Sequence, residues 1–377
     1  MERIYLDHAA TTPVREEVVE AMLPFLKSEF GNPSSGHKYG AAPRKAVQSA
    51  RQQVADLLGC GPREIVFTSG GTESNNHAIK GIAAALRDRG RHIITSSVEH
   101  PSVLQVCRHL ETRGYEVTYL PVDGHGLVSV AEVEKALQPD TVLISVMHAN
   151  NEVGTIQPIP EIAELARANG ILLHTDAAQS VGKVPVDVDR LGVHLLTVAG
   201  HKLYAPKGVG ALYVQSGIRP VKFMHGGAQE AGMRAGTENV LEIVGLGKAC
   251  EIAARDMSRN LEAMESARDW LLRSICSELS AVRRNGHPER ALPNTLSLSF
   301  QGLDAGHILD GIGAEVAASA GAACHAGEIR ISHVLEAMGV PEDWARGTLR
   351  LSTGKMTTLD NAEKAARAVI DAVGALR

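Results

Sequence analysis

Cysteine is scarce in this sequence, and the few cysteines are not arranged in pairs. The 377 residues include five cysteines, an odd number, with wide spacing and no C-x-x-C motif. This pattern argues against a disulfide framework and a zinc knuckle, and it predicts free thiols in a reducing compartment and no bound metal. Cys60, Cys107, Cys250 and Cys276 are interpreted as small core residues, whereas Cys324 needs a separate argument.

Long hydrophobic runs and runs of basic residues are missing as well. The longest apolar runs are interrupted and have the length of strands, which predicts no membrane-spanning helix. Lys and Arg number 38 against 43 Asp and Glu, a formal net charge of −5, so neither nucleic acid nor an anionic membrane is an expected partner. The opening Met1-Glu2-Arg3-Ile4 does not resemble a signal peptide, and we expect a cytoplasmic protein.

The composition is that of an ordinary globular protein, 44% hydrophobic and 21% charged, and the length favours two lobes. Between residues 14 and 250, strand-sized apolar runs alternate with amphipathic segments. This alternation predicts an α/β domain with a mostly parallel sheet covered on both faces. The expected strands lie at residues 64–67, 92–95, 116–120, 142–146, 171–175, 195–198 and 210–214.

The rest of the chain is expected to form a smaller α+β domain, made of residues 1–13 and 251–377. A long helical stretch runs from about residue 240 to 279. It is followed by expected strands at 295–300 and 348–351 and expected helices at 305–311 and 359–375.

Two of the apolar runs are followed by residues that suit one cofactor. One run ends at Asp176, and the next is followed by Lys202. Ligands of parallel sheets bind at the carboxyl ends of strands. In fold-type-I enzymes of pyridoxal 5′-phosphate (PLP), a lysine amine holds the cofactor and a carboxylate pairs with its ring nitrogen. Taken alone, each residue is more often a surface lysine or a strand-end cap.

A pair of glycines makes the interpretation of Asp176 and Lys202 as cofactor ligands more specific. Gly70 and Gly71 follow the run at 65–67 and precede a helical segment, and Thr72 adds a hydroxyl. Glycines at a helix start expose backbone N–H groups that can hold a phosphate, although Gly-Gly turns without a phosphate are common. The turn, the acid and the lysine follow the order that a phosphate, a ring nitrogen and an aldehyde require, which predicts a PLP site.

With these residues in place, the chain resembles the cysteine desulfurase and selenocysteine lyase family of class-V aminotransferase-like PLP enzymes over nearly its whole length. The resemblance implies PLP fold type I, the aspartate-aminotransferase-like α/β fold, with a mostly parallel central sheet in a large domain and a small α+β domain. The matching motifs are Tyr5–Pro13, Gly31–Ser35, Ser69–Asn75, Glu99-His100, Asn150–Gly154, His174–Gln179, Gly200–Lys202, Arg234–Asn239 and Arg350–Gly354.

The same resemblance implies a role for each matching residue at the cofactor. Lys202 would hold PLP and later move the substrate α-proton, for which its amine must be neutral. His100 would stack on the ring and assist proton transfer, and Asp176 would pair with the ring nitrogen. The cofactor-binding set is Gly71, Thr72, His100, Asn151, Asp176, Gln179, His201, Lys202 and Thr237, in which Thr72, His201 and Thr237 serve the phosphate.

Substrate and partner roles are implied in the same way. Arg350 would bind the carboxylate of a small amino acid in a bidentate fork, with Asn151 and His325 beside it. Thr237 would reach the phosphate of the neighbouring subunit, which implies a homodimer. A selenium or sulfur acceptor protein is a possible further partner.

Cys324 is the second catalytic group that the resemblance implies. It lies among small residues and glycines that suit a loop able to bring the sulfur to a substrate chalcogen. Without the resemblance, an inert residue in an alanine-rich turn would be the simpler interpretation. A reactive cysteine needs thiolate character, for which His325 is a candidate source.

Departures from the desulfurase pattern favour selenocysteine as the substrate. Ala199 stands where desulfurases usually have a serine, and Ala322-Ala323-Cys324-His325 resembles the corresponding loop of animal selenocysteine lyases. Pro101 supports neither enzyme. We therefore expect a PLP-dependent selenocysteine lyase that forms L-alanine and reduced selenium. The alternative is a cysteine desulfurase with a persulfide on Cys324.

Two further functions are alternatives, a scaffold protein and an aminotransferase. A weakly catalytic sulfur-relay scaffold would not need Lys202, Asp176, Cys324 and Arg350 together. An aminotransferase of the same fold would leave Cys324 unexplained.

Overall fold

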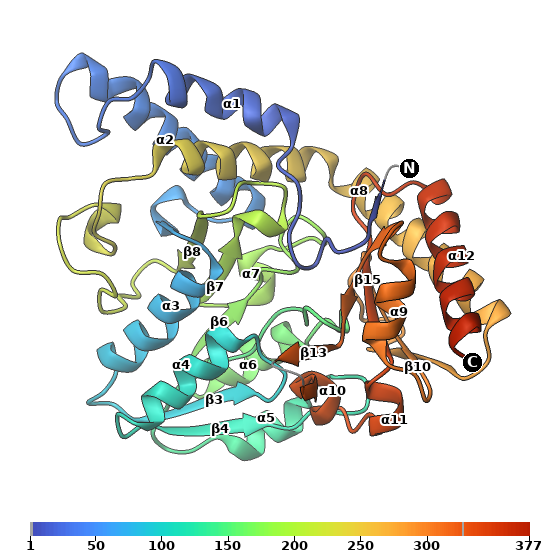
Figure 1. The fold of residues 1–377 in the computed structure, drawn as a ribbon. Helices are drawn as coiled ribbons and strands as arrows, with labels where there is room; N and C mark the ends of the chain where they lie inside the picture. The colour runs from blue at the N-terminus through green and yellow to red at the C-terminus, as the bar shows by residue number, and fades with distance from the viewer. Residues whose placement is uncertain (1–2, 326–327) are drawn as a thin grey trace.

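A seven-stranded sheet forms the centre of the larger part of the molecule (Figure 1). The computed structural model describes residues 3–325 and 328–377, and for residues 322–325 and 328–330 it describes the backbone alone. The strand order is β2 (Ile65–Thr68), β8 (Gly210–Val214), β7 (Leu195–Ala199), β6 (Leu172–Asp176), β5 (Thr141–Ser145), β3 (His92–Ser96) and β4 (Glu116–Leu120). Only β8 runs antiparallel to its neighbours. The mostly parallel sheet is confirmed, with strand bounds within one residue of those expected.

The strands are almost continuous runs of buried residues because helices cover both faces of the sheet. Every residue of β3, β5 and β7 is buried, as expected for parallel strands between two helical layers, and the antiparallel β8 is buried over its whole length as well. The edge strand β4 is only partly buried. The helices of this part are α1 (Glu16–Lys27), α2 (Lys38–Leu58), α3 (Gly71–Ala85), α4 (Pro101–Glu111), α5 (Val130–Ala136), α6 (Ile159–Ala168) and α7 (Val188–Leu191), with short turns η1 (Pro62–Glu64), η2 (Gly200–Lys202) and η3 (Glu230–Gly232).

A second, four-stranded antiparallel sheet lies beside the first, packed by α9 (Ala305–Ile312) and α12 (Leu359–Leu376) (Figure 1). Its order is β12 (Ser319–Ala320), β15 (Thr348–Ser352), β10 (Thr295–Phe300) and β9 (Val282–Asn285). The N-terminal strand β1 (Ile4–Tyr5) pairs with β11 (Val316–Ala317) next to it. The remaining elements are the hairpin β13 (Ala322–His325) and β14 (Glu328–Ile331), and helices α10 (His333–Ala337) and α11 (Glu342–Ala345).

One long helix, α8 (Val240–Glu278), joins the two parts (Figure 1). Its first half contributes Ile243 and Leu246 to the core under the large sheet. Its second half contributes Leu271 and Ile275 to the core of the second sheet. The predicted boundary at residue 250 falls inside this helix, and the division into 14–250 and 1–13 with 251–377 stays a prediction.

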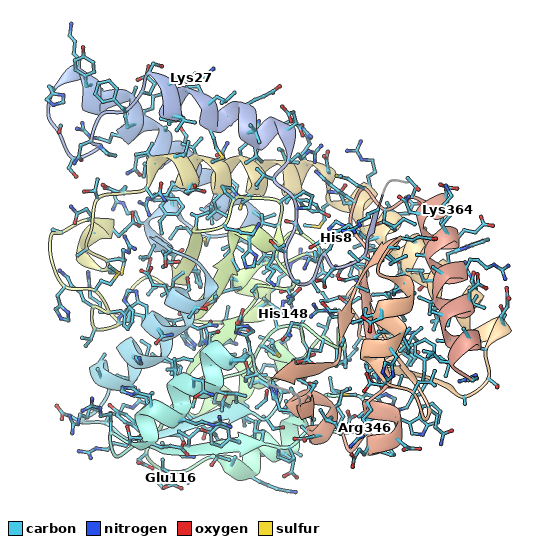
Figure 2. The ribbon with its side chains drawn as sticks, in the orientation of Figure 1. His8, Lys27, Glu116, His148, Arg346 and Lys364 are labelled. Carbon is cyan, nitrogen blue, oxygen red and sulfur yellow. The ribbon has the colours of Figure 1, made fainter. Side chains whose placement is uncertain are left out.

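Figure 2 contrasts buried histidines with charged side chains at the surface: His8 and His148 are inside, whereas Lys27, Glu116, Arg346 and Lys364 face outward. In the described ranges, no helix has both the length and the apolar character needed to span a bilayer.

The interpretation of four cysteines as core residues is wrong for one of them. Cys107 and Cys250 are buried and Cys60 is half-buried, but Cys276 is exposed. The reason is helical geometry: Ile275 faces the core of the second sheet, and the next residue of α8 turns toward solvent. Burial raises the pKa of the Cys60, Cys107 and Cys250 thiols to about 12, so these three thiols are poor nucleophiles at neutral pH.

Candidate active site

A cavity of about 420 Å³ lies where β6 and β7 end and α3 begins. Such a place, at the carboxyl ends of parallel strands, is the usual ligand site of an open α/β sheet. Nine residues singled out from the sequence line it: Gly71, Thr72, His100, Asn151, Asp176, Gln179, His201, Lys202 and Arg350.

Three other predicted site residues are not placed in this cavity. Thr237 is exposed and does not line it. Cys324 and His325 belong to β13, and their side chains lie outside the described part of the chain. The segment expected as a loop is thus a hairpin in its backbone, with the β-branched Ile329 and Ile331 favouring the second strand.

Lys202 extends from the turn after β7 into the cavity. Its Nζ donates to the carbonyl oxygens of Ala9 at 2.5 Å and Ala10 at 2.7 Å. Burial, reinforced by the positive charge of Arg350, lowers the pKa of Lys202 from 10.5 to about 8, although Asp176 acts in the opposite direction. A large fraction of the amine is therefore neutral, and nucleophilic, in mildly alkaline solution.

Asp176 ends β6 with a carboxylate that is held on both oxygens. Its Oδ1 accepts from the Ala178 backbone N–H at 3.0 Å, and its Oδ2 accepts from Asn75 Nδ2 at 2.7 Å. Only 7% of Asp176 is exposed. This arrangement suits a carboxylate that faces a protonated ring nitrogen.

His100 caps the start of α4 and is open to the cavity. The backbone N–H of Ser102 donates to its Nδ1 at 3.1 Å, and Ser102 Oγ lies 2.7 Å from the same nitrogen. Packing around the remainder of the ring lowers the pKa of His100 by desolvation, so the neutral imidazole is favoured.

The start of α3 forms a cradle for an anion. Gly70 has φ +146°, a conformation that only glycine adopts easily, and within the described residues no side chain caps the first N–H groups of the helix. A Cβ on Gly71 would come within 3.2 Å of the Ala199 Cβ. Backbone N–H groups at a helix start and the adjacent Thr72 hydroxyl are suitable phosphate ligands.

His201 and Gln179 complete the lining near this cradle. Burial and the charge of Lys202 lower the pKa of His201 to about 4, so this ring is neutral. Gln179 donates from Nε2 to the Ala9 carbonyl at 2.9 Å and accepts on Oε1 from Lys183 Nζ at 2.9 Å. The Ala9 carbonyl only accepts, so it fixes the orientation of the Gln179 amide, with Nε2 toward Ala9 and Oε1 toward Lys183.

Arg350 enters the cavity from β15 of the second sheet. Its Nη1 donates to the backbone oxygen of Asn151 at 2.9 Å, and its Nη2 donates to Asp7 Oδ1 at 2.9 Å. These contacts orient a half-buried guanidinium toward the cavity that also holds Lys202. The site thus depends on both sheets.

Four residues of this arrangement were missed by the sequence analysis: Asp7, Asn75, Ser102 and Lys183. Asp7 and Asn75 lie inside matching motifs, which could have marked them, but neither has a spacing that reveals its partner. Ser102 and Lys183 carry no signal in the sequence pattern, because their contacts depend on how α4 and the turn after β6 pack.

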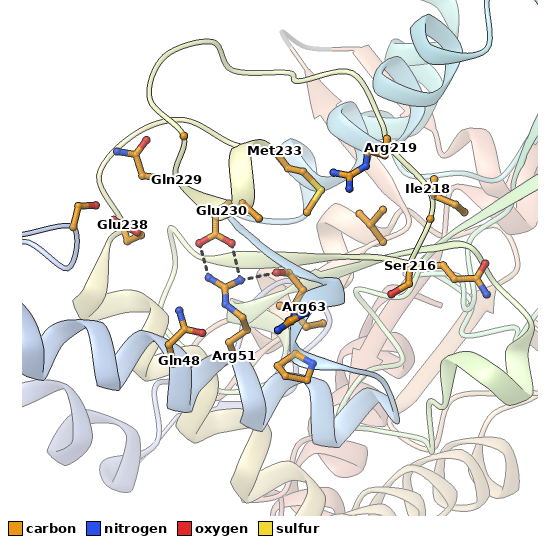
Figure 3. Close-up of a pocket in the computed structure, with 18 residues that line it drawn as sticks. Gln48, Arg51, Arg63, Ser216, Ile218, Arg219, Gln229, Glu230, Met233 and Glu238 are labelled. Carbon is orange, nitrogen blue, oxygen red and sulfur yellow. Dashed lines mark hydrogen bonds and ion pairs between the residues drawn. The ribbon is translucent and has the colours of Figure 1, made fainter.

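A larger cavity, of about 770 Å³, lies elsewhere and contains none of the predicted site residues. Figure 3 shows its Arg51 guanidinium facing the Glu230 carboxylate, with two contacts of 2.7 Å. Glu230 and Ala231 have φ angles of +48° and +54°, so the ion pair holds a strained turn. The turn anchors the segment that carries Thr237.

Comparison with known proteins agrees with this geometry. Residues 4–364 match the family model described as aminotransferase class-V. The chain belongs to the class-V aminotransferase family. A cysteine desulfurase IscS of Dictyoglomus turgidum is 50% identical over 359 residues, covering 95% of this chain and 91% of the relative. One from Methanosarcina thermophila is 48% identical over 375 residues, covering 99% and 93%.

Solved structures agree at the level of the fold. A NifS-like protein superposes with a TM-score of 0.92 at 37% identity, covering 98% of this chain and 99% of that one. A structure described as SspA in complex with cysteine gives a TM-score of 0.83 at 40% identity, covering 94% and 99%. The expected PLP fold type I is confirmed.

The cofactor of this class-V enzyme is PLP, as expected. The residues present fit it: a glycine cradle at a helix start, a buried carboxylate, a neutral imidazole and a lysine of lowered pKa line one cavity. When bound, PLP withdraws electrons from the α-carbon of an amino acid.

Proposed function

We propose that this enzyme is a cysteine desulfurase, which takes the sulfur of L-cysteine and releases L-alanine. The observation that carries the proposal is the similarity, at 44–50% identity over 94–99% of the chain, to relatives from several bacteria and an archaeon that are all named cysteine desulfurase. A cavity that holds an arginine from one sheet and a lysine from the other supports an amino-acid substrate.

In this proposal the cavity residues divide the work at the cofactor. Lys202 holds PLP through its amine and, once released, moves the α-proton of the substrate. Asp176 keeps the ring nitrogen protonated, and His100 covers the ring. Gly71, Thr72 and His201 bind the phosphate. Gln179 and Asn151 form hydrogen bonds to the ring oxygen of the cofactor and lie on the side of the ring where the substrate binds.

Arg350 and Cys324 act on the substrate. The Arg350 guanidinium pairs with the substrate carboxylate, exchanging part of its contact with Asp7. The Cys324 thiolate, with His325 next to it in the sequence, attacks the substrate sulfur. An S–S bond forms as the substrate Cβ–S bond breaks, and the electron pair of the broken bond stays with Cβ, which takes up a proton and becomes the methyl group of L-alanine. Cys324 keeps the sulfur as a persulfide for an acceptor protein. The assignment to Cys324 is supported by three of the other four cysteines, because burial raises the pKa of each of these thiols to about 12 and makes it a poor nucleophile.

We also infer a homodimer in which Thr237 reaches the phosphate of the neighbouring site. The support is that Thr237 is exposed, away from the cavity of its own subunit, on a segment held by the Arg51–Glu230 pair. A cytoplasmic location remains part of the proposal.

L-Selenocysteine is the second candidate substrate. Ala199 beside the phosphate cradle and the Ala322–His325 string favour it, but the relatives described above are named cysteine desulfurase and not selenocysteine lyase. The names of the relatives therefore shift the proposal from the selenocysteine lyase that the sequence predicts to the cysteine desulfurase.

Parallel assays of L-alanine formation from the two amino acids, with and without reductant, test the choice. We expect turnover of L-cysteine that is lost in Cys324→Ala. A wild-type enzyme that prefers L-selenocysteine by tenfold or more in kcat/KM, about 1.4 kcal/mol of discrimination, and that keeps this activity in Cys324→Ala would overturn the proposal in favour of the lyase.

A further inference from the structure

Behind the cavity, one buried asparagine joins two of the groups that line it. Asn75 lies in α3 and is fully buried. Its Nδ2 donates to Asp176 Oδ2 at 2.7 Å and to Ser102 Oγ at 2.8 Å. Ser102 in turn contacts His100 Nδ1. A continuous chain of hydrogen bonds therefore runs from Asp176 through Asn75 and Ser102 to His100.

The direction of each hydrogen bond in this chain is fixed. Both amide hydrogens of Asn75 are used, and turning the amide over would place Oδ1 against a carboxylate oxygen, where two acceptors repel. Within the described residues Asn75 Oδ1 has no partner, which is unusual for a buried acceptor. The amide keeps this orientation because the two acceptors on its other side require it.

The proton of the neutral His100 ring follows from these directions. Ser102 Oγ accepts from Asn75, so its own hydrogen is free for His100 Nδ1, and the backbone N–H of Ser102 is directed at the same nitrogen. A proton on Nδ1 would displace both donors. The ring proton is therefore held on Nε2, the nitrogen left to the cavity.

We propose that Asn75 and Ser102 are positioning residues that keep the His100 proton on Nε2 and tie this ring to the Asp176 carboxylate. The inference rests on the proposed function for its catalytic consequence. His100 then presents an N–H group and no free lone pair to the bound cofactor and substrate. It can therefore donate a hydrogen bond there but cannot take a proton, and removal of the α-proton is left to Lys202.

Nitrogen NMR of the holoenzyme with ¹⁵N-labelled histidine tests the tautomer, because protonated and unprotonated ring nitrogens have well-separated shifts; His100→Gln identifies the signals. We expect Nδ1 unprotonated and Nε2 protonated in the wild type. In Asn75→Leu we expect a mixture of tautomers. The kcat should fall at least about tenfold, because a ring with its proton on Nδ1 no longer offers this hydrogen-bond donor to the reacting groups, with KM changed less than about threefold.

Asn285 offers a matched control. It is a buried asparagine of β9 whose Nδ2 donates to Ser297 Oγ at 3.2 Å and Ser299 Oγ at 2.8 Å, and whose Oδ1 also has no partner among the described residues. Asn285→Leu should leave the His100 signals and kcat unchanged. If Asn75→Leu does not fold, Ser102→Ala, which keeps the backbone donor, should still shift the His100 signals toward the other tautomer.

The proposal is overturned if Nδ1 carries the proton in the wild type, or if His100 has the wild-type tautomer in the folded Asn75→Leu and Ser102→Ala variants. The NMR experiment contains no amino-acid substrate. An unexpected tautomer therefore counts against this inference alone, whereas a wild-type enzyme that forms no alanine from L-cysteine counts against the proposed function.

Discussion

Lys202 and Lys183 are two lysines of the same region with different surroundings. Lys183 is 3% exposed, does not line the cavity and donates to Gln179. Burial lowers its pKa to about 7. Lys202 lines the cavity, and its pKa is lowered to about 8 by burial and then by Arg350. At the residue scale, position rather than acidity selects the lysine that can meet the cofactor.

The charge of Arg350 should set the pH at which the apoenzyme takes up PLP. Uptake needs the neutral Lys202 amine, whose fraction rises with pH through the pKa of about 8. Arg350→Met removes a charge that lowers this pKa, so the pH midpoint of the uptake rate should move upward. The rate is followed by the visible absorption of the bound cofactor.

Arg346→Met is the control, because it removes the same charge from an exposed ion pair with Glu342. A midpoint that stays in place in Arg350→Met, or moves equally in both variants, would contradict the influence of Arg350 on Lys202.

At the element scale, the segment between β3 and α4 contains a buried acid that the site does not use. Glu99 is fully buried, and its Oε1 accepts from Ser96 Oγ at 2.6 Å and from the Met147 N–H at 2.8 Å. Burial raises the pKa of Glu99 from 4.5 to about 8. The folded state therefore holds a proton that the unfolded chain releases above pH 4.5.

This proton should make stability fall as the pH rises from about 4.5 to about 8. In that window the native state binds one proton more than the unfolded state, which lowers the free energy of unfolding by at most about 1.4 kcal/mol per pH unit. Glu99→Gln removes the effect. Thermal unfolding of both proteins across this window should show a flatter profile for the variant, and parallel profiles would rule the buried proton out.

Local sequence patterns were sufficient for the strands of the central sheet, but not for the hairpin of β13 and β14, which was expected as a loop, or for the contacts between elements. Continuous apolar runs located the central strands because both faces of that sheet are covered. The spacing of Gly71, Asp176 and Lys202 located the cavity because all three follow strand ends of one sheet. Asn75 and Lys183 could not be assigned, because their roles depend on the packing of separate segments, and the exposure of Cys276 depends on the orientation of α8.

At the scale of the whole molecule, the segment that carries Thr237 is tied to both α2 and α3. Arg51 holds Glu230, and Arg234 Nε lies 2.9 Å from Glu73 Oε1, near the start of α3. The segment is thus anchored on the body of the chain while Thr237 itself is exposed. This arrangement suits a residue that serves a neighbouring site.

Subunit mixing should reveal this division of labour. Lys202→Ala and Thr237→Ala should each be impaired alone. In a hybrid dimer one site carries both changes and the other carries neither, so alanine formation should partly return after the two are mixed. Subunit exchange is verified with differently tagged chains. If activity does not return although hybrids form, Thr237 does not act across the interface.

The cofactor is expected in the cavity at the ends of β6 and β7, and every residue role proposed above depends on this placement. Reduction of the holoenzyme with borohydride, followed by digestion and mass spectrometry, fixes PLP permanently to the lysine that holds it. We predict that the label is found on Lys202 and that Lys202→Ala takes up none. A label on Lys183, or on any lysine outside this cavity, would contradict the account.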